Sequence, residues 1–125
     1  MGYGQVNVGS KKQGNELIEL FLVSVDGTKS LISDVLSAKT SDTISYSLTG
    51  GSFVQQQWDS YSYLEGSNDN SSWTTIDSLH VVATSVRNKK DSTTGYKYYR
   101  LRATVKGDVM TRSFSNCFAF IGLFQ

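Results

Sequence analysis

Residues 43–48 read Thr-Ile-Ser-Tyr-Ser-Leu, so apolar and hydroxyl side chains alternate along this part of the chain. In an extended strand, successive side chains point to opposite faces of the sheet. Ile44, Tyr46 and Leu48 therefore share one face, and small hydroxyl residues share the other. The alternation predicts a β-strand with one buried face.

A second alternation runs over residues 96–105. Leu101, Ala103 and Val105 fall on one face, and Arg100 and Arg102 fall on the opposite face. This pattern is typical of a sheet that packs on a core with one face and meets water with the other.

The segment 110–124 is apolar on both faces. One face holds Phe114, Phe118 and Phe120, and the other holds Cys117, Ala119 and Ile121. We expect a last strand that is buried on both sides, either central in the sheet or beneath a partner.

Further strands are expected between turn residues. The apolar segment 15–25 fits a buried strand or a short capped helix, and we favour the strand. Asp26 and Gly27 form a favoured two-residue turn, which predicts a hairpin returning over 28–35. A long hairpin is predicted from 53–64 to 73–76 around a polar turn, and residues 87–95 are predicted to be a polar loop.

About eight short strands without a long helix predict an all-β protein, a single β-sandwich of Ig-like or jelly-roll-like type over residues 15–125. Residues 1–14 hold four of the eleven glycines and few apolar groups. We expect them to form a flexible N-terminal arm, either a frayed terminus or an arm that orders on a partner.

The charge balance excludes several kinds of partner. Twelve basic and eleven acidic residues give a net charge of +1, which provides no field for nucleic acid or an anionic membrane. The apolar run 20–23 is too short to span a bilayer, and the first residues lack the apolar stretch of a signal peptide. The single cysteine, Cys117, cannot form an intramolecular disulfide, so we expect the core alone to hold a soluble fold.

No residue pattern indicates catalysis or metal binding. His80 is the single histidine, and no nucleophile motif surrounds it. Cys117 lies in an apolar strand, where a core role is expected. One cysteine and one histidine cannot complete a zinc site, and the turn 68–70 lacks the glycine and glutamate of a calcium loop. We therefore expect no enzymatic activity, no cofactor and no metal.

Aromatic residues are the remaining candidates for function. Tyrosine and tryptophan offer large contact areas at low entropic cost, and they concentrate in interfaces and sugar-binding surfaces, although they also fill sandwich cores. We predict partner binding through Tyr3, Val6, Val8, Trp58, Tyr61, Tyr63, Tyr96, Tyr98 and Phe124.

Two segments resemble known proteins. Residues 63–76, Tyr-Leu-Glu-Gly-Ser-Asn-Asp-Asn-Ser-Ser-Trp-Thr-Thr-Ile, resemble a hairpin of small Ig-like β-sandwich proteins from tailed-phage virions, and also of discoidin-type modules. Residues 95–103, Gly-Tyr-Lys-Tyr-Tyr-Arg-Leu-Arg-Ala, resemble the tyrosine-arginine strand that follows in both. The opening Gly-Tyr-Gly-Gln-Val-Asn-Val-Gly is similar to the extended N-termini of phage structural proteins, which favours the virion family.

The resemblance implies a structural protein of a bacteriophage virion, assembled in the host cytoplasm. The expected role is a capsid decoration or cement subunit that binds the major capsid protein, as a homo-oligomer or in many copies per particle. Within the same class, a tail or neck component is the alternative. From another class, the alternative is a discoidin-like host-adhesion module that binds surface glycans.

Overall fold

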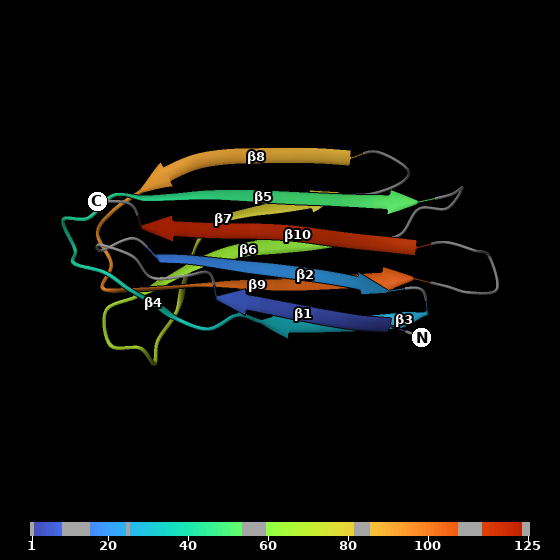
Figure 1. Cartoon of the computed structure of the whole chain (residues 1–125), viewed down its shortest axis with the longest axis horizontal. Helices are drawn as coiled ribbons and strands as arrows, with labels where there is room; N and C mark the ends of the chain where they lie inside the picture. The colour runs from blue at the N-terminus through green and yellow to red at the C-terminus, as the bar shows by residue number, and fades with distance from the viewer. Residues whose placement is uncertain are drawn as a thin grey trace.

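The computed structural model describes residues 2–8, 16–24, 26–53, 60–81, 86–107 and 114–123. Side chains are described over 17–24, 26–51, 60–81, 87–107 and 116–123. These residues form two antiparallel sheets that lie one over the other, and none of the described residues is helical (Figure 1). The predicted all-β sandwich is confirmed.

Ten strands make up the described part of the two sheets. In sheet 1 the order is β1 (Gly2–Val8), β2 (Glu16–Ser24), β10 (Phe114–Leu123), β5 (Ile44–Phe53) and β8 (Val86–Thr93). In sheet 2 the order is β3 (Gly27–Ile32), β9 (Tyr98–Gly107), β6 (Ser60–Ser67) and β7 (Thr74–Val81), and the short β4 (Leu36–Ser37) also pairs with β9. Figure 1 shows sheet 1 as one layer, with β8 and β1 at its edges.

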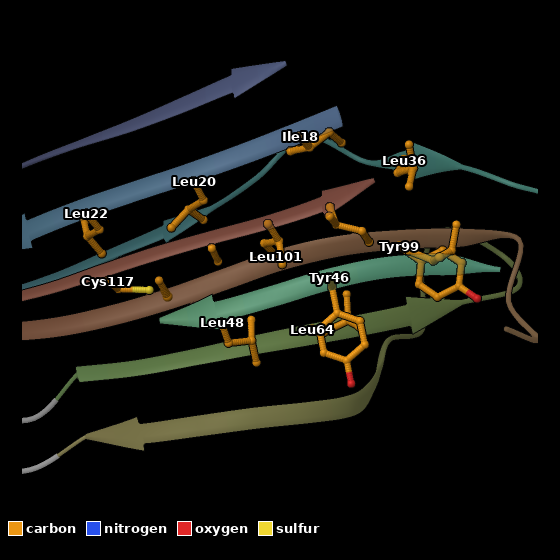
Figure 2. Packing of buried hydrophobic residues seen from close by; sticks show 14 of the residues in the cluster. Ile18, Leu20, Leu22, Leu36, Tyr46, Leu48, Leu64, Tyr99, Leu101 and Cys117 are labelled. Carbon is orange, nitrogen blue, oxygen red and sulfur yellow. The ribbon is translucent and has the colours of Figure 1, made fainter. Parts of the chain in front are cut away.

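The core lies between the two sheets, where alternate side chains of each strand meet (Figure 2). Ile44, Tyr46 and Leu48 of β5 are buried, as their alternation predicts. Sheet 2 contributes Leu101, Ala103 and Val105 of β9, which are also buried. Burial of one such leucine stabilises the fold by about 1.5–3 kcal/mol. The other fully buried aliphatic residues include Ile18, Leu20, Leu22, Leu36, Leu64 and Ile121.

The turn at Asp26 and Gly27 does not make the predicted hairpin, because β3 pairs with β9 in sheet 2 and not with β2. Gly27 has a φ of 84°, and the Ser24 hydroxyl donates a 2.6 Å hydrogen bond to the Gly27 carbonyl. The chain therefore crosses from one sheet to the other at this turn. A positive φ at glycine suits both connections, so the sequence could not distinguish them.

The loop predicted over residues 87–95 is wrong at 87–93, because these residues belong to β8 (Val86–Thr93), an edge strand beside β5. An edge strand that meets water on both faces has no apolar alternation, so its sequence is similar to that of a loop. Arg87, Lys89, Lys90 and Asp91 lie in this strand. Charged residues on an edge discourage pairing with other sheets.

The N-terminal segment also differs from the free arm expected over residues 1–14. Gly2–Val8 forms β1, which pairs with β2 at every residue from Gly2 to Val8. The edge of β2 offers backbone hydrogen bonds, and β1 takes them even though its sequence has few apolar residues. The mobility of this segment stays a prediction.

Strand β10 is central in sheet 1, between β2 and β5, as predicted. Within the chain itself, however, only one face of β10 is buried, and burial of the other face beneath a partner stays a prediction. Cys117, Ala119 and Ile121 point into the core, but Phe118 on the opposite face is 42% exposed. Since β10 belongs to an outer layer of a two-layer fold, only one of its faces can reach the shared core.

A β-bulge in β7 turns two consecutive residues toward the other sheet. The register between β6 and β7 shifts at Leu64, which leaves Ile76 without a residue opposite. Ile76 packs against the core. Asp77 accepts a 2.6 Å hydrogen bond from the Tyr46 hydroxyl and a 2.7 Å hydrogen bond from Lys89 Nζ. These contacts tie β7 of sheet 2 to β5 and β8 of sheet 1.

The charge states at this contact favour the same hydrogen bonds. Burial by itself raises the pKa of Asp77, but hydrogen bonds from Lys89 and Tyr46 together outweigh burial and hold that pKa below its usual range. Burial raises the pKa of Tyr46, and the hydrogen bond to Asp77 raises it further. At neutral pH the tyrosine is therefore protonated as a donor, and the aspartate is ionised as an acceptor.

Replacement of Asp77 by asparagine is expected to lower the free energy of unfolding by about 1–3 kcal/mol at neutral pH, because charge-assisted hydrogen bonds across the sheets are lost. The folded-state pKa of Asp77 is lowered, so its contribution is present above its unfolded pKa of about 3.9 and is lost as pH falls through the folded value. Urea denaturation of wild type and Asp77→Asn measures this difference at neutral and at acidic pH. The difference should shrink on acidification.

The matched control is Asp34→Asn, which removes the same charge from an exposed residue after β3. A similar loss of stability in both variants, or a difference that is constant with pH, would contradict a specific role for Asp77.

Candidate binding surfaces

Aromatic and arginine side chains form a continuous row on the outer face of sheet 2. Arg100 pairs in register with Glu65, and Arg102 pairs with Tyr63. The Arg100 Cζ lies 4.2 Å from the centroid of the Trp73 ring, and the Arg102 Cζ lies 4.0 Å from that of Tyr63. We name this set the Arg–aromatic row; its members are Trp73, Arg100, Glu65, Arg102, Tyr63, Tyr61 and His80.

Glu65 joins the two arginines. Its Oε1 accepts a 2.8 Å hydrogen bond from Arg100 Nε, and its Oε2 accepts a 3.1 Å hydrogen bond from Arg102 Nε. Only 7% of the Glu65 side chain is exposed. A carboxylate at this depth is stable because both of its oxygens are paired with cations.

The ring faces of the row are covered by neighbouring side chains. Tyr61 and His80 stack at 4.0 Å between centroids, and Tyr61 and Tyr63 lie parallel at 6.3 Å. Arginine covers one face of Tyr63 and one face of Trp73. A sugar that stacks on an aromatic ring needs an open ring face, so these contacts reduce the ring area available to a glycan, although they account for only one face of Trp73.

The structure brings together two of the predicted binding residues, Tyr61 and Tyr63, and separates the other two described tyrosines from them. Tyr96 packs at the end of the sandwich, edge-on to Tyr99 with centroids 6.0 Å apart. A Cβ added to Gly66 would lie 2.7 Å from the Tyr96 ring, so the glycine makes room for this packing. Tyr98 is half-buried, opposite Ser67.

The remaining predicted contacts cannot be placed as side chains. Tyr3, Val6 and Val8 belong to β1, of which the backbone alone is described, while Trp58 and Phe124 lie outside the described residues. A role in partner binding stays a prediction for all nine residues.

An apolar patch lies on the part of the outer face of sheet 1 that β2 and β10 form. Phe118 is opposite Phe21, and Phe120 is opposite Glu19. Phe118 is 42% exposed, while Phe21 and Phe120 are half-buried. We name this set the Phe118 patch; its members are Leu17, Phe21, Val23, Phe118 and Phe120.

Sequence reasoning found the alternation in β10 but missed the surface that it creates. One signal is size: Cys117 and Ala119 are small, whereas Phe118 and Phe120 are large. Size does not decide the question by itself, because Ile121 on the inner face of β10 is also large. The Arg–aromatic row was also missed, because contacts between Glu65, Arg100 and Trp73 depend on the pairing of strands far apart in sequence.

The polar turn 68–72 is closed by its own hydrogen bonds. Asp69 Oδ1 accepts from the backbone N–H groups of Ser71 and Ser72 at 2.9 and 2.7 Å. These backbone hydrogen bonds, from Ser72 and then Ser71, hold the pKa of Asp69 below its usual range. Asn70 adopts a φ of 58°. The carboxylate is thus occupied as in an ordinary Asx turn.

Within the described ranges, no cluster of three or more histidine, cysteine, aspartate or glutamate side chains is arranged to hold a metal ion. None of the described segments is a helix with the length and apolar character needed to cross a membrane.

Comparisons with known proteins give the fold alone. No family model matches the sequence, and no curated protein matches it. Among solved structures, PirA is 8% identical with a TM-score of 0.51, covering 81% of this chain and 92% of its own. The PBSX exported protein XepA is 16% identical with a TM-score of 0.52, and the match covers 95% of this chain but 36% of XepA.

The module TmCBM61, solved with β-1,4-galactotriose, is 11% identical with a TM-score of 0.48, covering 96% of this chain and 88% of its own. The matches to PirA and XepA, with TM-scores of 0.51 and 0.52, show similarity of fold alone, and similarity of fold leaves function open.

The Cys117 thiol is expected to be inert in the folded protein. Cys117 is fully buried, and burial raises the pKa of its thiol to about 12. Since the thiolate is the reactive form, labelling by a thiol reagent near pH 8 should be at least ~1000-fold slower than in the unfolded chain, whose thiol pKa is about 8.5. Absorbance with Ellman's reagent measures both rates. Rapid labelling of the folded protein would contradict a purely structural role for Cys117.

Proposed function

We propose that this chain is a non-enzymatic structural protein of a bacteriophage virion, and that it binds a neighbouring virion protein through the Phe118 patch. The observation that carries the proposal is the exposure of Phe118, at 42%, between Phe21 and Phe120 on the outside of sheet 1. Contiguous exposed apolar patches mark interaction sites in soluble proteins.

A stable contact would extend from Phe118 over the outer face of sheet 1. A standard protein interface takes about 800 Å² from each partner, roughly an eighth of the 6723 Å² surface of this chain. The outer face of one sheet can supply that area. Because the two sheets are held by one core, the face is presented as a rigid surface, and little ordering entropy is lost on binding.

The virion context rests on sequence resemblance. Segments 63–76 and 95–103 resemble small Ig-like proteins of tailed-phage virions, and both belong to the confirmed sandwich. The fold shared with the PBSX exported protein XepA is compatible with this context. Within it, we propose a capsid decoration subunit that sits over the major capsid protein. Many equivalent copies would compensate for a modest contact by each one.

Two alternative functions predict different binding partners. A tail or neck component would bind purified tails and leave capsid shells unbound. A glycan-binding module would bind sugars on an array, although the covered rings of Tyr61, Tyr63 and Trp73 give this function less support.

The direct test is co-sedimentation of the purified chain with phage capsid shells that lack it. Wild type should bind saturably, at a fixed number of copies per shell. Phe118→Ser should weaken binding by about tenfold or more, since truncation of a central aromatic contact costs more than about 1.4 kcal/mol.

The matched control is Ile32→Ser. Ile32 is an equally apolar surface residue, 52% exposed, and it lies on the outer face of sheet 2. Binding by this variant should stay within about twofold of wild type. Absence of saturable binding to shells would overturn the decoration role, and equal loss in both variants would overturn the role of the Phe118 patch.

A further inference from the structure

We infer that Arg100 and Arg102 form a binding site for the carboxylates of an acidic, extended segment of a partner protein. This site lies on sheet 2, on the opposite side of the molecule from the Phe118 patch, and therefore goes beyond the proposed contact. It does not depend on the virion assignment.

The two guanidinium groups are held in fixed positions. Glu65 accepts from Nε of both arginines, at 2.8 and 3.1 Å, and the faces of Trp73 and Tyr63 support the guanidinium planes. Strand β9 places Arg100 and Arg102 two residues apart on one face, so the groups are spaced by about 7 Å along the strand. Binding of an anion would therefore restrict little further rotation of these side chains.

Among the described residues, Arg100 and Arg102 use few of their hydrogen-bond donors. A guanidinium has five N–H donors, and the hydrogen bonds described for Arg100 and Arg102 use only Nε–H. The side chains are 21% and 34% exposed, so their outer edges meet water. The terminal nitrogens of a guanidinium match the two oxygens of a carboxylate.

The surrounding face is cationic. Among the described outward positions of sheet 2, Glu65 is the one carboxylate, and it is shared by two arginines. Lys106 lies on the same face of β9, and the outward positions of β3 are Thr28, Ser30 and Ile32. An acidic partner therefore meets attraction here, and no second carboxylate among these positions opposes it.

The composition of the row favours a protein partner. Tryptophan, tyrosine and arginine are the residues that dominate binding energy in protein interfaces. The covered ring faces disfavour a saccharide, and a chain with net charge +1 disfavours a nucleic acid. An extended segment with glutamates at alternate positions repeats the ~7 Å spacing of the arginines, because both are i, i+2 positions of a strand.

The test uses a short fluorescent peptide of alternating glutamate and serine, with fluorescence anisotropy at low salt as the readout. A peptide with the same composition but paired glutamates should bind more weakly. Arg102→Gln should weaken binding of the alternating peptide by about tenfold. The matched control is Lys106→Gln, which removes the same charge from the same face and should change binding by no more than about twofold.

Circular dichroism checks that each variant folds. If Arg102→Gln does not fold, Arg102→Lys serves instead: it keeps the charge but loses the fork of donors, and should weaken binding by about threefold or more. Absence of binding by wild type, equal loss in Lys106→Gln, or equal affinity for the two peptides would overturn the site.

Polygalacturonate and duplex DNA are competitors that identify the class of partner. The assignment to a protein would be overturned if either competitor displaced the labelled peptide at a lower concentration of carboxylate or phosphate groups than the unlabelled peptide needs. These variants leave the Phe118 patch intact, so failure of this site and failure of shell binding are separate results.

Discussion

The inner strands of the two sheets give alternate side chains to a single layer between them. In β10 that layer takes Cys117, Ala119 and Ile121, and in β9 it takes Leu101, Ala103 and Val105. Burial of these residues provides the main stabilisation. Because one face of each of these strands is buried in the core, only their outer faces can contact other molecules. The contact of Asp77 with Tyr46 and Lys89 then fixes one sheet relative to the other.

The two outer faces differ in chemistry. Sheet 1 exposes the apolar Phe118 patch, whereas sheet 2 exposes the Arg–aromatic row, with cations paired to Glu65 and supported by rings. An apolar face gains binding free energy when a partner excludes water from it. A cationic face gains specificity, because it favours partners of opposite charge. The two proposals together make the molecule a rigid adaptor, with a lattice contact on one side and an acidic neighbour on the other.

The sequence predicted the sandwich because alternation in residues 43–48 and 96–105 reports directly on burial. It failed where local patterns are ambiguous. Gly27 permits a hairpin or a crossing between sheets, and an edge strand such as β8 has the composition of a loop. The Phe118 patch was not predicted, because both faces of β10 are apolar and the alternation does not say which one faces the core. The Arg–aromatic row was not predicted either, because Glu65 meets Arg100 and Arg102 only after β6 pairs with β9.

Hydroxyl-radical footprinting of the chain, free and bound to capsid shells, measures directly which side chains lose contact with water. If the Phe118 patch is the contact surface, Phe118 and Phe21 are oxidised in the free protein and protected on the shell, while Ile32 is oxidised at similar rates in both. Oxidation of Phe118 at an unchanged rate in saturated shells would contradict the claim that the outer face of sheet 1 is the contact surface.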